Sequence, residues 1–102
     1  MTLKVRLTPP AHVQFLAALA YIRADRPSAA AAFRHRVDEA LARLGDFPDS
    51  GRVVPEFPDL PFREVIVDQY RFFYRAKDRT VWVVAAWRGA QIPDAPADVV
   101  DG

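Results

Sequence analysis

The chain has 102 residues, of which 51% are hydrophobic and 26% are charged. This length suits one compact domain and is too short for two, and the composition excludes a disordered or low-complexity chain. The absence of cysteine excludes a disulfide scaffold, a thiolate metal site and catalysis by a cysteine nucleophile. No basic segment followed by an apolar run opens the chain, and the uncharged residues 13–22 amount to about half a membrane span. We therefore expect a cytosolic protein without a membrane-spanning segment.

The net charge of +1 conceals an uneven distribution along the chain. Residues 1–44 hold seven basic and three acidic side chains, residues 45–88 hold seven of each, and the last fourteen residues hold three Asp and no cation. Arg outnumbers Lys by twelve to two, which favours carboxylate or phosphate partners because the planar guanidinium binds both in bidentate fashion. A codon preference for Arg accounts for the excess equally well. We predict a single basic domain over residues 1–90, followed by an acidic and flexible tail over residues 91–102.

The first predicted elements are a strand over residues 3–7 and a helix over residues 11–24. Apolar residues alternate with Lys4 and Arg6 in the strand, as on a half-buried strand. The helical segment contains no Gly or Pro, and its apolar residues recur at helical spacing. They are Val13, Phe15, Leu16, Leu19, Ala20 and Ile22. These residues form a broad apolar stripe along the predicted helix.

A second helix is predicted over residues 28–44. Pro27 and Ser28 suit the first turn of a helix, and Gly45 is expected to end it. The apolar positions recur at spacings of three and four, and they are Phe33, Val37, Leu41 and Leu44. Because the connection between the two helices is short, they are expected to pack as an antiparallel hairpin.

The second half of the chain predicts an antiparallel meander. Residues 45–61 are punctuated by Pro and Gly and are expected to form an ordered but irregular connection. Three segments rich in Val, Ile and aromatic residues follow, over residues 62–67, 70–76 and 80–87, with connections of hairpin length. The order strand, helix, helix, strand, strand, strand predicts an α+β domain with the helical hairpin on one face of the sheet.

The sheet face away from the helices is expected to mix arginine with aromatic side chains. Side chains alternate across a strand, so Arg71, Phe73 and Arg75 point to one face. In the last strand, the same alternation puts Trp82, Val84, Ala86 and Arg88 on one face. Arg interleaved with aromatic rings suits single-stranded nucleic acid or a peptide, and a merely solvated strand face is the simpler interpretation.

Residues able to carry catalysis are scarce. His12 and His35 are expected on exposed helix faces, while Ser28 and Ser50 are expected at a helix start and in a turn. The sequence has neither a metal-ligand spacing nor a Gly-rich phosphate loop. We therefore predict no metal and no cofactor. Any catalysis would have to rest on Arg and Tyr, which stabilise phosphoryl charge and position a nucleophile.

Five groups of residues occur in a fixed order over nearly the whole chain. They are LARLGDFP (residues 41–48), SGR with PE (50–52 and 55–56), FREV (62–65), YRFFYR (70–75) and VVAAWRGAQ (83–91). Together they resemble the RelE/ParE superfamily of bacterial toxins, and YRFFYR after the Gly-Arg and Pro-Glu loop is the more specific piece. The fold of that family, two N-terminal helices against an antiparallel sheet, agrees with the element order derived above.

The resemblance implies the toxin of a type II toxin–antitoxin system. Such a toxin is neutralised by a cognate antitoxin protein that lays a helix and an extended segment over it, in a hetero-oligomer. RelE-like members of the family cleave mRNA in the ribosomal A site, whereas ParE-like members inhibit DNA gyrase without a known catalytic site. A member that has lost toxicity and acts as a binding or regulatory module is a third alternative.

The same resemblance suggests candidate site residues. By position, Arg63, Arg71 and Arg88 match basic residues that RelE-like nucleases use in catalysis. Where many relatives have Trp-His-Gly, residues 87–89 read Trp-Arg-Gly, and no Tyr or His follows, so the usual general acid or base of a nuclease is missing. We therefore predict a ParE-like gyrase inhibitor, with an mRNA endoribonuclease as the alternative. The residues expected to bind the target or the antitoxin are Arg23, Arg26, Arg34, Arg36, Arg52 and Arg75.

Overall fold

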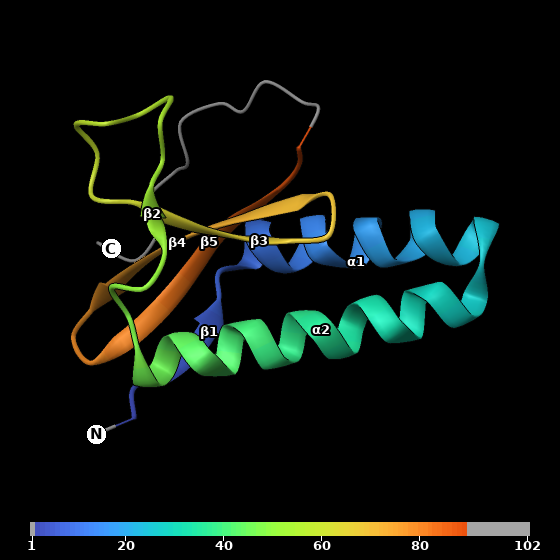
Figure 1. Ribbon diagram of the computed structural model, residues 1–102, viewed down its shortest axis with the longest axis horizontal. Helices are drawn as coiled ribbons and strands as arrows, with labels where there is room; N and C mark the ends of the chain where they lie inside the picture. Colours follow the sequence, from blue (N-terminus) through green and yellow to red (C-terminus); the bar gives the residue numbers. More distant parts are fainter. Residues whose placement is uncertain (1, 90–102) are drawn as a thin grey trace.

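The two helices lie side by side against one face of a five-stranded sheet (Figure 1). The computed structural model describes residues 2–89, so the predicted tail over residues 91–102 lies outside the described residues. The strands are β1 (Lys4–Leu7), β2 (Arg52–Val53), β3 (Arg63–Val67), β4 (Tyr70–Lys77) and β5 (Thr80–Arg88). They are arranged in the order β1-β5-β4-β3-β2, with β1 parallel to β5 and the other pairs antiparallel. The predicted α+β class is confirmed.

The helices begin at prolines. In α1 (Pro9–Asp25), the Thr8 side-chain oxygen accepts a hydrogen bond from the Ala11 backbone N–H at 3.4 Å. Prolines suit this first turn because its N–H groups have no partner within the helix. Helix α2 (Pro27–Asp46) follows with Arg26 at its N-cap position and no side-chain cap, so the predicted start at Ser28 is one residue late. Neither helix in the described part of the chain is long and apolar enough to cross a membrane.

Gly45 allows a close approach of β1 rather than ending α2. The prediction that it stops the helix is wrong, because α2 continues to Asp46. The backbone N–H of Leu3 donates to the Gly45 carbonyl oxygen at 2.8 Å. A Cβ atom at residue 45 would lie 2.6 Å from the Leu3 carbonyl oxygen, so any larger residue would push the N-terminal segment away.

The connection over residues 45–61 contains a short strand that the sequence pattern does not reveal. Strand β2 pairs with the start of β3, with Arg52 opposite Glu64 and Val53 opposite Arg63. Two residues are too few to show an alternating pattern. The Tyr74 hydroxyl fixes the turn before β2. It donates to the Pro48 carbonyl and accepts from the Gly51 N–H, both at 2.9 Å.

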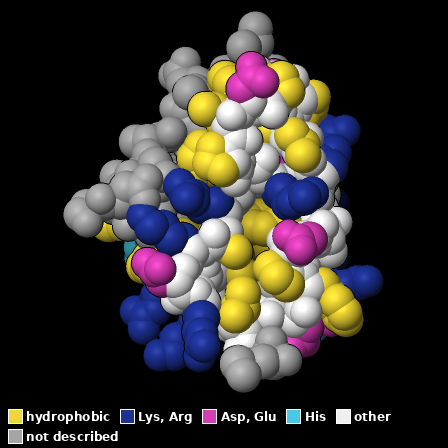
Figure 2. Space-filling model, turned by 90° about the vertical axis from the view of Figure 1, so that its left-hand side faces the viewer, with side chains coloured by type: hydrophobic (Ala, Val, Ile, Leu, Met, Phe, Trp, Pro, Cys, Tyr) yellow, Lys and Arg dark blue, Asp and Glu magenta, His cyan; other side chains and the backbone are white. Residues whose placement is uncertain are grey.

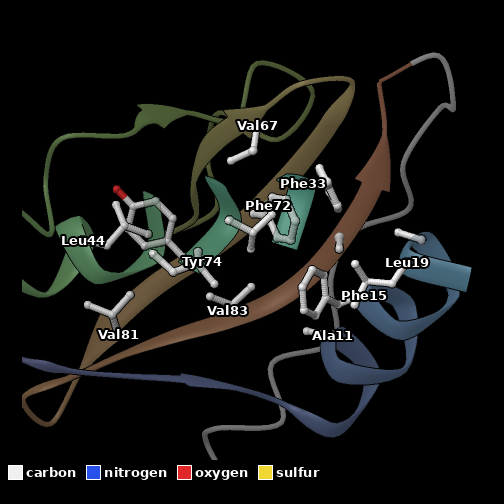
Figure 3. Packing of buried hydrophobic residues seen from close by; sticks show 14 residues of the cluster. Ala11, Phe15, Leu19, Phe33, Leu44, Val67, Phe72, Tyr74, Val81 and Val83 are labelled. Atoms are coloured by element: carbon white, nitrogen blue, oxygen red, sulfur yellow. The ribbon is translucent and has the colours of Figure 1, made fainter. Parts of the chain in front are cut away.

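The main core lies between the helices and the sheet (Figure 3). The Phe15 ring of α1 packs against Phe33 of α2 and Phe72 of β4, with centroid separations of 6.3 and 6.1 Å. Val13 and Leu16 belong to the predicted apolar stripe of this helix but lie outside the core. Their side chains lie on the outer side of α1 and are 66% and 49% exposed.

A second, smaller apolar cluster lies on the other face of the sheet. Val54 and Phe57 lie in the connection between β2 and β3, and Phe62 is the last residue of this connection. They pack in one cluster with residues of β4 and β5, namely Phe73, Trp82, Val84, Ala85 and Trp87. The face predicted to be free is therefore partly covered by this connection.

A bulge in β5 changes the predicted alternation of its side chains. Phe73 is opposite Ala85 and Tyr74 is opposite Val83, which leaves Val84 as an extra residue. Val84 and Ala85 consequently both belong to the smaller cluster, while Ala86 belongs to the main core. The prediction that Trp82 and Ala86 share a face is wrong, because a bulge reverses the alternation after the inserted residue.

Candidate functional site

Arg71 lies in a buried ion-pair network on the face of the sheet opposite the helices. Its Nε donates to Glu64 Oε1 at 2.6 Å. Its Nη1 and Nη2 donate to the two carboxylate oxygens of Glu56 at 2.7 and 2.6 Å. Arg52 Nε donates to the other Glu64 oxygen at 2.6 Å. The Arg71 side chain is 9% exposed, so its guanidinium joins the connection after β2 to the sheet and presents little surface to a substrate.

The charges in this network stabilise one another. The hydrogen bonds from Arg71 lower the pKa of the Glu56 carboxyl to about 2. The hydrogen bonds to Glu56 and Glu64 raise the pKa of Arg71 above its ordinary value. The ring centroid of Phe73 lies 5.2 Å from the Arg71 guanidinium carbon, within the range of a cation–π contact. Glu56 and Arg71 are therefore expected to stay ionised at neutral pH.

Arg63 lies on the opposite face of the sheet from Arg71. It is directly opposite Tyr74 on β4, and opposite residues of neighbouring strands share a face. Tyr74 belongs to the main core under the helices, and burial raises the pKa of its phenol. Arg63 Nη1 donates to the Gly51 carbonyl at 2.9 Å. The Arg63 guanidinium therefore braces the turn before β2.

Arg88 lies at the far end of β5, next to α1. Its guanidinium carbon is 4.9 Å from the centroid of the Tyr21 ring, and its Nη1 donates to the Tyr21 hydroxyl at 3.3 Å. Arg88 is opposite Tyr70, which packs against the main core, so it shares the helix-facing side with Arg63. Arg63 is opposite Tyr74, which lies four residues beyond Tyr70 along β4. The three arginines expected to form a catalytic face are thus divided between two faces and two ends of the sheet.

The six arginines expected to bind a partner are also separated in space. Arg23, Arg26 and Arg34 lie exposed on the helical hairpin, and they have no ion-pair partner among residues 2–89. Arg36 Nη2 pairs with Asp68 of the turn between β3 and β4 at 2.6 Å. Arg52 donates to the buried Glu64 carboxylate, although its own side chain is 61% exposed, and Arg75 stands opposite Trp82 on β5. Arg23, Arg26 and Arg34 are therefore the members of this set that are exposed and form no ion pair within residues 2–89.

An apolar surface on α1 is the feature that sequence reasoning missed. Val13, Leu16 and Tyr21 are all exposed on this helix. A groove of about 350 Å³ lies beside Tyr21, lined by Gln14, Ala17, Ala18, Tyr21, Tyr70, Ala86, Trp87 and Arg88. The sequence already indicates this surface, because α1 carries apolar residues on all sides. Such a pattern is unusual for a surface helix without a partner.

Helix α1 covers part of the β5 edge beyond the end of β1. Strand β1 ends at Leu7, opposite Val83, and the chain then turns into α1. Beyond that point, the Ala86 N–H donates to the side-chain oxygen of Gln14 at 2.8 Å instead of to a strand. Only displacement of the Gln14 side chain would free this N–H, and a sheet edge with free backbone groups can accept an added strand.

No cluster of His, Asp and Glu that could hold a metal ion is present in residues 2–89. His12 and His35 are exposed. His35 Nε2 lies 3.1 Å from Glu39 one helical turn further along α2.

The matching family and two similar solved structures all belong to toxin–antitoxin systems. The profile of the family described as "ParE toxin of type II toxin-antitoxin system, parDE" matches residues 5–93. The solved chromosomal ParDE toxin–antitoxin system from P. aeruginosa aligns with a TM-score of 0.72 and 14% identity, over 85% of this chain and 96% of that chain. The toxin–antitoxin complex RelBE2 from Mycobacterium tuberculosis aligns with a TM-score of 0.61 and 21% identity, over 86% of this chain and 99% of that chain. No curated protein sequence matches the chain significantly. At these identities, the two structures establish a shared fold.

Proposed function

Because the chain belongs to the ParE toxin family of type II toxin–antitoxin systems, we propose that it inhibits DNA gyrase by protein contact and is neutralised by a cognate antitoxin. The resemblance to the RelE/ParE superfamily is confirmed by the family match. The choice of gyrase over mRNA rests on one observation: the Arg71 guanidinium is occupied by Glu56 and Glu64. An arginine that stabilises a phosphoryl transition state has to reach the substrate.

The division of the three arginines supports the same choice. Catalytic groups work together when they lie within hydrogen-bond reach of one reacting atom. Arg63 contacts the turn at Gly51, and Arg88 contacts Tyr21 on α1. A binding function needs no such constellation, only an accessible and complementary surface.

The helical hairpin is the surface that we assign to the target. Its tip, where α1 passes into α2, extends beyond the edge of the sheet (Figure 1). Arg23 and Arg26 lie at this tip, and Arg34 lies two turns into α2. Exposed guanidinium groups on a projecting hairpin can enter a recess in a larger protein or contact DNA phosphates.

The outer face of α1 is the surface that we assign to the antitoxin. The exposed side chains of Val13, Leu16 and Tyr21 suit the apolar face of a partner helix. If the partner displaces the Gln14 side chain from the Ala86 N–H, the edge of β5 suits an extended segment of the same partner. Covering these groups would remove apolar surface from water at about 25 cal/mol per Å².

Two assays with the purified protein separate the possible functions. In a gyrase supercoiling assay, we expect loss of supercoiling. In a translating ribosome extract, we expect intact mRNA. Cleavage of mRNA in the ribosomal A site would overturn the proposal in favour of a RelE-like endoribonuclease. If both assays show no effect, the protein is a non-toxic binding or regulatory member of the family.

The antitoxin surface has a separate test. We expect Leu16→Glu to abolish capture by the protein encoded in the adjacent small reading frame, because it places a charge in an apolar contact. Ala31→Glu is the matched control, since residue 31 is also an exposed helix position, on α2. Equal binding by the two variants, with unchanged circular dichroism spectra, would exclude the α1 face.

A further inference from the structure

A second pocket lies between the helical hairpin and the turn that joins β3 to β4. Its volume is about 230 Å³, and it is lined by both helices, by this turn and by the end of β5. We call it the turn pocket. It shares Tyr21, Tyr70 and Arg88 with the groove beside α1 and is otherwise lined by different residues. The Tyr21 ring, on which the Arg88 guanidinium is stacked, forms one of its walls.

The interior of the turn pocket is apolar and mainly aromatic. Phe33 of α2 and Tyr70 of β4 contact each other there, with ring centroids 5.2 Å apart. Ile22 and Ala29 add aliphatic surface. An apolar cavity of about 150 Å³ holds benzene, so a pocket of about 230 Å³ has room for a bicyclic ring. A flat ring suits these walls because aromatic rings attract one another in offset-stacked and edge-to-face arrangements.

An ion pair between Arg36 and Asp68 forms the polar rim of the turn pocket. Arg36 Nε and Nη2 donate to the Asp68 carboxylate, and the shortest of these distances is 2.6 Å. Arg36 Nη1 makes no hydrogen bond to residues 2–89. Asp68 Oδ1 accepts a single bond, from Arg36 Nε at 3.1 Å. The two charges compensate each other, and the pair still offers one donor and one acceptor to a neutral ligand.

The turn that carries this rim is held from two sides. Asp68, whose φ angle is 56°, is tied to α2 by its ion pair with Arg36. The carbonyl oxygen of the next residue, Gln69, accepts from the Gly89 N–H at 2.6 Å. Because these contacts fix the turn before any ligand arrives, binding in the turn pocket costs little ordering of the protein.

We propose that the turn pocket binds a purine base. The bicyclic ring fills the interior against Phe33 and Tyr70, and its hydrogen-bonding edge meets the rim. With adenine, the exocyclic amino group donates to the Asp68 carboxylate, and ring nitrogen N1 accepts from Arg36 Nη1. A pyrimidine leaves part of the interior empty, and an indole ring offers Arg36 no acceptor. The affinity is in the millimolar range, because the half-exposed groups of the rim also form hydrogen bonds with water.

Titration of adenine into the isotope-labelled full chain, followed by NMR, tests the site. We expect saturable shifts of the Ala29, Gln69 and Tyr70 amide signals, and nuclear Overhauser contacts between the adenine ring protons and the Ile22 methyl groups. Cytosine and indole should bind about fivefold more weakly or less, since each lacks one part of the match. Absence of saturable shifts with adenine, or equal binding of indole, would overturn the proposal.

Filling the interior of the pocket provides the first matched comparison. Ala29→Leu places a larger side chain in the pocket and should weaken adenine binding about fivefold or more, because the ring loses its space. Ala31→Leu makes the same replacement at an exposed position of α2 and should leave the affinity unchanged. Equal affinities of the two variants would contradict a purine in the turn pocket.

Neutralising the rim provides the second comparison. Asp68→Asn should weaken adenine binding about fivefold, because a carboxylate is a stronger acceptor than an amide. Asp78→Asn is the control, since Asp78 has a similar φ angle of 53° in the turn between β4 and β5. That turn lies at the opposite end of the sheet (Figure 1), on the side of the molecule that Figure 2 views. Equal effects of the two substitutions would exclude Asp68 from the site.

A purine base can come from a free nucleotide or from an unpaired base of a nucleic acid strand. Adenosine monophosphate and an oligonucleotide of twelve deoxyadenosines distinguish these sources. Shifts of the Ala29 and Gln69 amides at least as strong with the mononucleotide as with the oligonucleotide would identify a free nucleotide, and tighter binding of the oligonucleotide would identify a strand. If neither compound shifts these amides, the pocket does not admit a purine joined to a sugar, and the proposal fails.

Discussion

The Arg71 network shows how strongly a few charges can depend on one another. The Glu64 side chain is completely buried, and an ionised carboxylate in that position is tolerated only because Arg71 and Arg52 both donate to it. Its partners are 7 and 12 residues away in the sequence. Removing one member of the network leaves the remaining charges without compensation.

Glu64→Ala should therefore lower the free energy of unfolding by about 3–5 kcal/mol, the usual cost of breaking a buried ion pair. Glu39→Ala is the control, because Glu39 is also paired, with His35, but its side chain is 68% exposed. Its loss should change stability by about 0–1 kcal/mol. Urea unfolding of both variants measures the difference, and similar values would contradict the assigned role of Glu64.

Acid should weaken the network in a defined pH window. The pKa of Glu56 is about 2 in the folded protein and about 4.3 in an unfolded chain. A lowered folded pKa adds stability that is complete above the unfolded value and is lost as pH falls towards the folded value. The parent chain should thus exceed Glu56→Gln in stability at pH 6, with the difference shrinking between about pH 4.3 and 2. A constant difference between pH 6 and 2.5 in urea titrations would argue against this linkage.

The turn between β4 and β5 is the most strained connection among the described elements. Asp78 and Arg79 have φ angles of 53° and 62°, as a two-residue turn that follows the twist of a hairpin requires. Asp tolerates this conformation, whereas Arg gains nothing from it. The sequence pattern located the turn, but its length of two residues and its backbone conformation came from the register of the strands.

Arg79→Gly should raise stability by roughly 0.5–1 kcal/mol, because glycine adopts positive φ without steric cost. The same replacement in a helix has the opposite sign. Arg34→Gly, at an exposed position of α2, should lower stability by about 1 kcal/mol. Thermal unfolding of the two variants checks the direction of each stability change. Destabilisation by Arg79→Gly would show that the Arg79 side chain makes a stabilising contact.

Helix α1 illustrates the limit of periodicity at the scale of an element. Its apolar stripe predicted a helix, and Phe15 and Leu19 are indeed buried. Periodicity did not separate the core side from the exposed side, because Val13, Leu16 and Tyr21 extend apolar character around the helix. The exposed side was found only once the position of β5 and of α2 was known.

Across the whole molecule, charge and shape divide the surface into separate regions. The hairpin tip with Arg23 and Arg26 lies away from the sheet (Figure 1). Val13 and Leu16 lie in the first half of α1, away from this tip. A target and an antitoxin can therefore have distinct contact areas on a chain of this size.

If the hairpin tip contacts the target, Arg26→Glu should raise the half-inhibitory concentration in the supercoiling assay about tenfold at low salt, through loss of electrostatic attraction. Arg43→Glu is the control, an exposed arginine in the last turn of α2. The melting temperatures of both variants should stay close to that of the parent. A similar loss of inhibition in the two variants would exclude the tip as the contact.

Local patterns were enough to predict the α+β class, both helices and four of the five strands to within one or two residues at each end, and the family resemblance. These features follow from the spacing of apolar residues and from turn residues, which neighbouring positions control. The pairing of Arg71 with Glu56 and Glu64, the bulge at Val84, strand β2 and the need for Gly45 required the folded chain. Each of them depends on which distant residue arrives beside it, and neither periodicity nor composition encodes that contact.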